Sequence, residues 1–282
     1  MKSVKYAILI FVALFIISCG QSPGNNVLRI GYSEFSFDQA VVFVLKGILD
    51  QQPNVQVELY RVPDSTMFRA LAANELDVGI SAWTPNTHQR FFDMYPYEIL
   101  RHSMICDSLG LYLAVPGFST LETIDDLATA GDLYRNTILM PESRNAIFHA
   151  GSNVIEDYGL NAFSFRESSW DNIVSFVEES VGNNNHFVFV GMRPHWVFQR
   201  HNLRPLEDTK RSLGDFEQAH IVVNAQFPER MPAIANFLSR VRFNLRDIEN
   251  LMEMNQELGS EPYENAIRWI NQNTNRINRW LM

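Results

Sequence analysis

Short apolar segments alternate with amphipathic segments along most of the chain, and this alternation limits its fold more than any other feature. Strands are predicted at 28–32, 55–62, 76–80, 137–140, 162–165, 186–190 and 220–224. Helices are predicted at 38–49, 65–73, 145–158, 170–181 and over much of 232–282, with Asp64 and Asn244 as caps. Because strand–helix–strand alternation places helices on the faces of a sheet, the pattern favours an α/β fold.

The chain is predicted to cross twice between two lobes. An apolar run at 109–117 ends in a Pro-Gly pair and could carry the chain from one lobe to the next, and a polar stretch at 204–215 could bring it back. We therefore assign 27–112 and 211–282 to lobe 1 and 113–210 to lobe 2. The ligand cleft is expected between the lobes.

The N-terminal segment has the pattern of a bacterial signal peptide. Two lysines precede an apolar run at 6–17, which is too short for a permanent membrane span. The run ends just before Cys19, in a context that a lipoprotein signal peptidase accepts. We predict a signal peptide at 1–18 and a tether at 19–26, with a lipidated Cys19 holding the protein to the outer face of the cytoplasmic membrane. The alternative is an ordinary secretory signal.

The composition argues against several functions. Loss of the signal peptide lowers the 23 basic residues to 21 against 32 acidic ones, a net charge near −11 that would repel nucleic acid. With Cys19 lipidated, Cys106 would be the only free cysteine, so no intrachain disulfide is expected, and its apolar neighbours predict a buried thiol. No metal-ligand spacing, nucleophile elbow, Walker loop or dinucleotide fingerprint occurs. We therefore expect no metal, no cofactor and no enzymatic activity.

The segment 81–88, Ser-Ala-Trp-Thr-Pro-Asn-Thr-His, is the strongest indication of a binding site. It places Trp83 just beyond the predicted strand 76–80, at the sheet edge where α/β proteins bind ligands. His88 follows five residues later. An indole face attracts a cation, and an imidazole can hold an anion. A small zwitterion would suit such a site.

This segment and the later segment 191–198, Gly-Met-Arg-Pro-His-Trp-Val-Phe, resemble the two signatures of glycine betaine substrate-binding proteins. Those proteins serve ABC importers of quaternary ammonium solutes. The resemblance continues through 203–208 and extends over essentially the whole mature chain. It implies the type II periplasmic-binding-protein fold, two lobes that close on the ligand, and a membrane permease as partner.

The resemblance also implies roles for individual residues. Trp83 matches a tryptophan of the aromatic box around the trimethylammonium group, and His88 matches the histidine that holds the ligand carboxylate. The loop 141–145 matches the loop whose backbone amides bind that carboxylate. Arg144 and Asn145 would therefore offer their N–H groups, which suits amides that open a helix.

This sequence departs from the family pattern at several positions, so the resemblance does not identify the residues that form the other walls of the aromatic box. Met192 stands where the second signature has a box tryptophan, and the usual tryptophan after the first strand is absent. The carboxylate loop, usually rich in glycine, here contains Glu142 and Arg144. The candidate walls are Tyr32, Phe35, Trp170, Met192 and Trp196.

Two charged residues near these positions could influence which ligand is bound. Glu34 could offset the charge of a cation, which would favour a choline-like ligand or another amine over a zwitterion. Arg193 could pair with an acidic residue across the lobes or bind a ligand carboxylate, and the sequence does not decide between these roles.

The leading hypothesis is a lipid-anchored substrate-binding protein of an ABC importer, for glycine betaine, choline or a similar quaternary ammonium compound. One alternative keeps the fold and changes the ligand to a different amine or an amino-acid-like solute. Another is a surface receptor or adhesin without a transport role, which a pocket filled by Met192 and Arg193 would favour.

Overall fold

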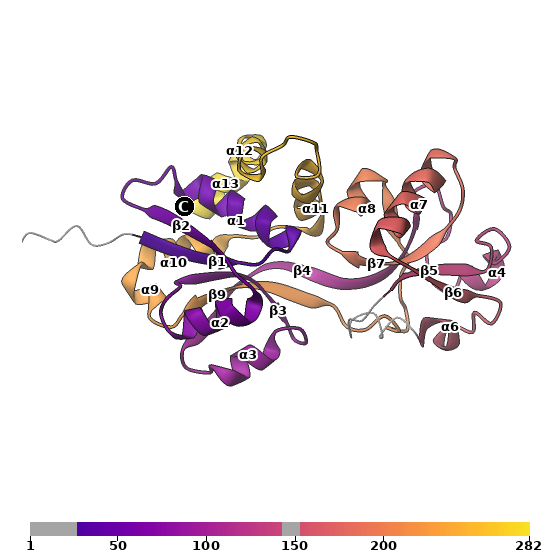
Figure 1. Ribbon diagram of the computed structural model, residues 1–282, viewed down its shortest axis with the longest axis horizontal. Coiled ribbons are helices and arrows are strands. Elements are labelled where there is room, and N and C mark those ends of the chain that lie inside the picture. The colour runs from indigo at the N-terminus through magenta and orange to yellow at the C-terminus, as the bar shows by residue number, and fades with distance from the viewer. Residues whose placement is uncertain (1–26, 143–152) are drawn as a thin grey trace, which may run out of the picture.

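The computed structural model describes residues 27–142 and 153–282, which form two lobes side by side (Figure 1). The first contains β1 (Val27–Tyr32), β2 (Gln56–Arg61), β3 (Val78–Thr84) and β9 (Glu217–Asn224). Its helices are α1 (Ser36–Leu49), α2 (Asp64–Ala72), α3 (Gln89–Met94), α9 (Phe227–Arg230), α10 (Pro232–Arg240), α11 (Leu245–Met254), α12 (Pro262–Gln272) and α13 (Thr274–Leu281). We call this half lobe 1.

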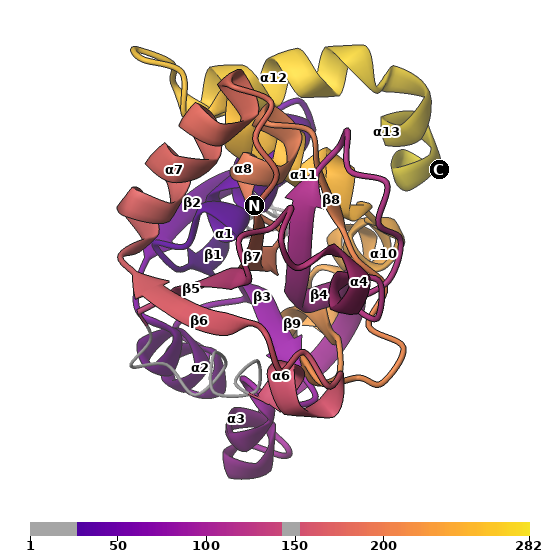
Figure 2. The ribbon, with the colours of Figure 1, turned by 90° about the vertical axis from the view of Figure 1, so that its right-hand side faces the viewer.

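The other half, lobe 2, is smaller. Its strands are β5 (Thr137–Pro141), β6 (Ser164–Ser168), β7 (Val188–Arg193) and β8 (Leu203–Pro205). Its helices are α4 (Leu127–Ala130), α6 (Val154–Asp157), α7 (Trp170–Gly182) and α8 (Trp196–Arg200). Seen along the long axis of the molecule, α7 and α6 lie on opposite sides of β5 and β6 (Figure 2). Lobe 2 is thus also a sheet with helices on both faces.

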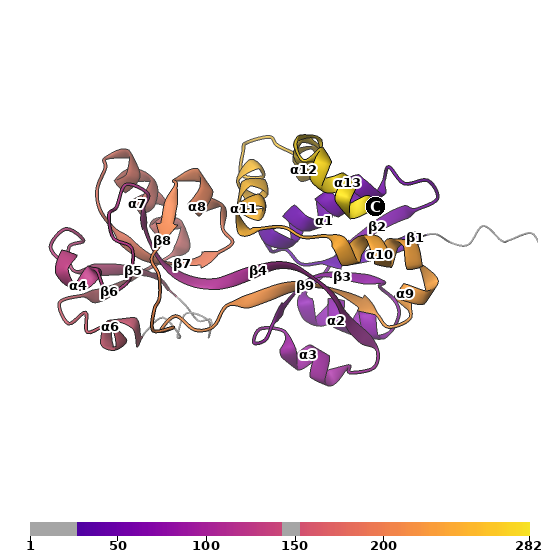
Figure 3. The same ribbon diagram turned by 180° about the vertical axis from the view of Figure 1, so that it is seen from behind.

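The strand β4 (Ile99–Pro116) belongs to both lobes. The hydrogen-bonded order is β2-β1-β3-β9-β4-β7-β5-β6, with β8 also paired to β4. The first part of β4 pairs with β9 in lobe 1, and residues 110–116 pair with β7 and β8 in lobe 2. Viewed from behind, β4 and the segment entering β9 run together between the lobes (Figure 3). The apolar run at 109–117 is therefore mostly strand.

The pairing between β4 and β9 is irregular over residues 101–109 of β4. The register shifts three times, the last shift falling between Cys106 and Leu109. Ser108 within it has a positive φ of 61°. An irregular ladder twists and bends more readily than a regular one, so the first crossing has the local structure of a hinge.

Two hydrophobic cores meet at the boundary between the lobes. In lobe 1, α1 buries an amphipathic face that includes Phe37, Val41 and Val44 against the sheet. Met192 packs against this core and also against a core of lobe 2, and Trp196 likewise contacts cores of both lobes. The lobes are therefore in apolar contact beside the cleft.

Several local predictions can be compared with these elements. Asn244 caps α11 in a capping box with Asp247, as predicted. The predicted cap Asp64 is wrong: α2 begins at Asp64 itself, and its carboxylate lies near His88 instead. Cys106 is buried, as predicted, and burial raises the pKa of its thiol to about 12. Most of the predicted helix 145–158 lies outside the described residues.

In the described part of the chain, no helix is both long enough and apolar enough to cross a membrane.

Candidate functional site

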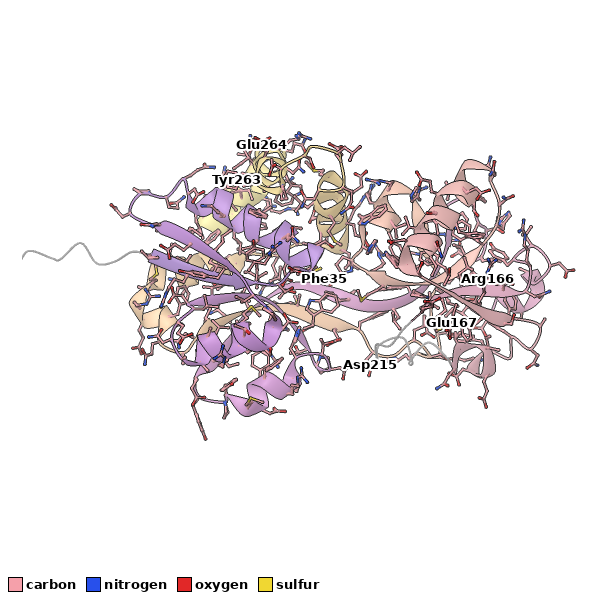
Figure 4. The ribbon with its side chains drawn as sticks, in the orientation of Figure 1. Phe35, Arg166, Glu167, Asp215, Tyr263 and Glu264 are labelled. Carbon is pink, nitrogen blue, oxygen red and sulfur yellow. The ribbon has the colours of Figure 1, made fainter. Side chains whose placement is uncertain are left out.

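Two neighbouring cavities lie between the lobes and share Phe35 and Met192 as lining residues. Phe35 lies in the middle of the molecule, where the lobes face each other (Figure 4). The lobe 1 cavity, of about 160 Å³, is also lined by Ser33, Asp38, Asp64, Ser81, Trp83, Thr87 and His88. The lobe 2 cavity, of about 290 Å³, is also lined by Pro141, Glu142, Trp170 and His195. Together they form one candidate cleft.

The sheet brings the lobe 1 residues together. Strands β1 and β3 are parallel neighbours, so their carboxyl ends meet at the same edge. The turn 33–35 follows β1 and the segment 81–88 ends β3, so both lie at this edge. This is the position in which α/β sheets bind ligands.

A bulge at the end of β3 shapes the wall of the cavity. The pairing of β3 with β9 slips by one residue between Gly79 and Ala82. Ser81, within the slip, has a φ of 71°, a left-handed conformation that is strained for a serine. In this arrangement the hydroxyl of Ser81 accepts a hydrogen bond of 2.7 Å from Trp83 Nε1. The bulge therefore fixes the orientation of the indole.

Trp83 and Phe35 form an aromatic corner. Their ring centroids are 5.6 Å apart and their planes are inclined by 64°. Phe37 supports Trp83 from a centroid distance of 5.8 Å. Trp83 is only 6% exposed, yet it lines the cavity. With the thioether of Met192 facing the same cavity, three sides of a small apolar cage are present.

His88 is held by two partners. Its Nδ1 accepts a 2.8 Å hydrogen bond from the backbone N–H of Trp83, which assigns the proton to Nε2. Nε2 lies 3.2 Å from Asp64 Oδ2 and donates to it. A ligand carboxylate could reach this imidazole only in place of Asp64. The predicted role of His88 as the carboxylate ligand stays a prediction.

The loop between Trp83 and His88 is braced from β9. The carboxylate of Glu217 accepts hydrogen bonds from the N–H groups of Asn86 and Thr87, at 3.1 and 2.8 Å, and from the Thr87 hydroxyl at 2.6 Å. Glu217 is buried. This segment is therefore a rigid support for the indole rather than a flexible loop.

Asp38 is a lining residue that was not among those predicted from the sequence. Its carboxylate accepts a 3.0 Å hydrogen bond from the N–H of Ser33, lines the lobe 1 cavity and is only 2% exposed. Burial raises the pKa of Asp38 to about 7, although hydrogen bonds from Ser33 and Ser81 lower it. Only its place in the first turn of a predicted helix, after the first strand, could have drawn attention to it.

The raised pKa of Asp38 has a defined effect on stability. Between about pH 4 and pH 7 the folded chain holds a proton that the unfolded chain has released. The proton on Asp38 thereby adds to the free energy of unfolding. This contribution is complete below the unfolded pKa of 3.8 and is lost as the pH rises through the folded pKa of about 7. In the empty protein above pH 7, Asp38 is therefore a buried charge that destabilises the fold.

In lobe 2, Trp170 and His195 form the opposite wall. Trp170 Nε1 lies 3.2 Å from His195 Nε2, and the backbone N–H of Val197 lies 3.3 Å from Nδ1; a neutral imidazole accepts at only one of these nitrogens. Burial lowers the pKa of His195 to about 4, so the ring is neutral at physiological pH. His195 lies within the second signature, 191–198, but was not among the predicted site residues.

The remaining candidates lie elsewhere. Tyr32 does not line either cavity and meets Phe43 edge-on at 6.2 Å. Trp196 is covered by the guanidinium of Arg200, 4.5 Å from its ring centre, and also lines neither cavity. Arg144 and Asn145 lie outside the described residues.

The structure places an oppositely charged side chain next to each of Glu34 and Arg193, whose roles the sequence did not decide. The Glu34 side chain is 83% exposed and lies 3.9 Å from Arg61. Arg193 donates to both carboxylate oxygens of Glu249, at 2.7 and 2.6 Å, and so joins β7 of lobe 2 to α11 of lobe 1. Arg193 is thus an ion-pair partner between the lobes.

The described lining residues give the cleft an acidic character. They include three carboxylates, Asp38, Asp64 and Glu142, and neither lysine nor arginine. Within residues 27–142 and 153–282, no cluster of three or more histidine, cysteine or acidic side chains is arranged to hold a metal ion. An apolar cage with nearby carboxylates suits a small organic cation.

Comparison with known proteins identifies similar sequences. Residues 26–272 match the family described as the substrate binding domain of ABC-type glycine betaine transport system. Over 165 residues, the chain is 27% identical to the glycine betaine/carnitine transport binding protein GbuC of Listeria monocytogenes. That match covers 57% of this chain and 54% of the relative, so the chain spans about half the length of this curated relative.

Solved structures with the same fold cover most of the chain. Lactococcal OpuAC in its closed form with glycine betaine has a TM-score of 0.67 at 21% identity, covering 91% of this chain and 99% of its own. A choline binding protein in complex with choline has a TM-score of 0.60 at 18% identity, covering 91% and 92%. The two-lobed periplasmic-binding-protein fold predicted from the sequence is therefore confirmed.

Proposed function

Because the chain belongs to the family of substrate-binding domains of ABC-type glycine betaine transport systems, we propose that its cleft captures a quaternary ammonium solute for an ABC importer. The chain is accordingly a binding protein and not an enzyme. The observation that carries the proposal is the aromatic corner of Trp83 and Phe35, which faces Met192 in a cavity between the lobes. Nearby carboxylates complement the charge of the ligand.

The chemistry of these walls suits a methylated ammonium group. Such a group cannot donate hydrogen bonds, so it is bound through its charge and its apolar surface. A desolvated cation over an indole gains up to ~2 kcal/mol. Phe35 offers a second ring, and the polarizable sulfur of Met192 packs adaptably around an irregular shape.

The position of the cleft would couple binding to closure. Trp83, Phe35 and Asp38 belong to lobe 1, whereas Met192, Trp170 and His195 belong to lobe 2. A ligand that contacts both groups binds the closed form more tightly and shifts the population toward it. Movement at the irregular part of β4 around Ser108 would bring the walls together, and the closed form would be the one that the permease engages.

Calorimetric titration of residues 26–282 tests this proposal directly. We expect micromolar binding of at least one compound among glycine betaine, choline, carnitine and proline betaine. Common amino acids serve as controls, since they lack the methylated head that the cage would surround. If none of the four quaternary compounds binds, the proposal is overturned, while the assignment of the fold stands.

A different amine is the second candidate ligand. Three carboxylates among the described lining residues would each accept hydrogen bonds from an ammonium group that retains N–H donors. The same titration with primary and secondary amines of similar size distinguishes the two. The adhesin alternative has less support, because Arg193 pairs with Glu249 instead of filling the cavity.

We also propose that Cys19 anchors the protein to the outer face of the cytoplasmic membrane. The proposal rests on the sequence before Cys19. Metabolic labelling with a fatty acid should label the wild-type protein, and Cys19→Ser should remove the label. Cys106→Ser is the matched control and should retain it, because Cys106 is buried in the fold. An unlabelled wild-type protein would contradict lipidation.

A further inference from the structure

Asp38 is a buried carboxylate that faces the ligand cavity. It is the third residue of α1, and its known partners are Ser33, through the backbone N–H at 3.0 Å, and the hydroxyls of Ser33 and Ser81. Ser81 also accepts the indole N–H of Trp83 at 2.7 Å. Asp38 is thus connected through one hydroxyl to the main wall of the cage.

The described charged groups around Asp38 leave it without a cationic partner. Next to β1 and β3, Arg29 pairs with Asp77 at 2.7 Å. On the α11 side, Glu249 pairs with Arg193, and on α12 both Glu264 and Arg268 are exposed.

Among the groups on the cavity side, Asp64 acts on Asp38 by like-charge repulsion and raises its pKa further. His88 directs its Nε2 at Asp64 rather than at Asp38. Glu34, in the preceding turn, is exposed and lies near Arg61. Residues 27–142 and 153–282 thus place no cation beside Asp38, and the charge that can pair with it in the cleft is that of the ligand.

We propose that Asp38 sets the preference of this cleft for a net cation over a zwitterion, and that binding of the cation expels a proton from Asp38 to solvent. The inference rests on the proposed function and deepens it. In the empty protein the carboxyl group is protonated over part of the physiological pH range. When the cation arrives, the O–H bond breaks, the proton leaves to water, and the carboxylate remains as the counter-ion of the ligand.

The difference between the two ligand classes follows from charge. Choline and glycine betaine carry the same trimethylammonium head, but choline ends in a hydroxyl and glycine betaine in a carboxylate. The ionised Asp38 attracts the head of both ligands and repels the tail of glycine betaine only. Asp64 and Glu142 add to that repulsion. The ionised cleft should therefore favour choline.

Titration calorimetry with choline and glycine betaine at pH 6, 7 and 8 tests the proposal. Neither ligand titrates in this range, so a pH dependence reports on the protein. For the wild-type protein, choline affinity should rise by about tenfold from pH 6 to pH 8. Repeating the pH 7 titration in buffers of different ionisation enthalpy should give about half a proton released per choline bound.

Asp38→Asn is the decisive variant. An asparagine keeps an oxygen that can accept from the Ser33 N–H, so the turn should fold as before. Choline binding at pH 8 should weaken by about tenfold, glycine betaine binding should weaken less, and the pH dependence and proton release should disappear. Asp93→Asn is the control, because Asp93 is exposed on α3 and lines neither cavity, and it should change none of these values.

The outcomes separate the inference from the function on which it rests. If the wild-type protein binds these ligands but Asp38→Asn leaves both the choline-to-betaine ratio and the pH dependence unchanged, the inference is overturned and the proposed function stands. If the wild-type protein binds neither ligand, nor any other quaternary amine, both are overturned. A melting curve for each variant confirms that it is folded.

Discussion

Replacement of Trp83 with alanine should raise the dissociation constant for a quaternary ammonium ligand by about thirtyfold or more. The indole supplies up to ~2 kcal/mol of cation–π energy, which corresponds to about thirtyfold in affinity. The change also removes the donor to Ser81 and the ring against which Phe35 packs edge-on. Titration calorimetry with the tightest ligand of the quaternary panel measures the effect.

Two further variants separate binding from folding. Trp83 is buried, so its truncation should also lower the free energy of unfolding by about 3–5 kcal/mol. Trp83→Phe keeps an aromatic face and should weaken binding less than alanine does. Trp196→Ala removes an indole that packs against both lobes but lines neither cavity, so it should destabilise the protein while affinity stays within about twofold. If the Trp83→Ala protein is folded and binds the ligand with wild-type affinity, the proposal that this cage binds the ammonium group is contradicted.

The parts of the site that the sequence predicted are those with a local signature. Trp83 was expected just beyond a strand at 76–80 and lies within the last two residues of β3, which extends to Thr84. The resemblance to a family drew attention to Met192 and to the walls Phe35 and Trp170. All four line the cavities. The strand and helix order was predictable for the same reason, because hydrophobic periodicity is a property of short segments.

The parts that the sequence missed depend on contacts between distant segments. Glu217 braces a loop 130 residues earlier in the chain. The sequence left the role of Arg193 open between an ion pair across the lobes and a ligand contact, and could not identify its partner, a glutamate 56 residues later. No periodicity indicates that Asp38 is buried or that Asp64 is the partner of His88. Such pairings exist only once the fold has brought the segments together, so a pattern of residue types cannot specify them.

The ion pair between Arg193 and Glu249 provides the second large prediction. It joins the lobes beside the cleft, and the Glu249 side chain is only 2% exposed against 18% for Arg193. Arg193 also lies over the rings of Tyr112 and Phe198, at 5.7 and 5.0 Å from their centres. Removing one partner of a buried pair leaves the other charge without compensation, which typically costs about 3–5 kcal/mol.

Glu249→Gln should therefore lower the free energy of unfolding by about 3–5 kcal/mol, as measured by urea denaturation. The neighbouring pair of Arg200 and Glu253, 3.5 Å apart, joins α8 of lobe 2 to the same helix α11 but is about one-third exposed on each side. Glu253→Gln is thus a matched control and should cost at most about 1 kcal/mol.

The double variant Arg193→Met with Glu249→Leu removes both charges together. Because no buried charge is then left unpaired, it should recover much of the stability lost in Glu249→Gln. Equal destabilisation by Glu249→Gln and Glu253→Gln would show that the pair contributes no more than a surface contact. In that case the apolar packing of Met192 and Trp196 against both cores would be what holds the lobes together beside the cleft.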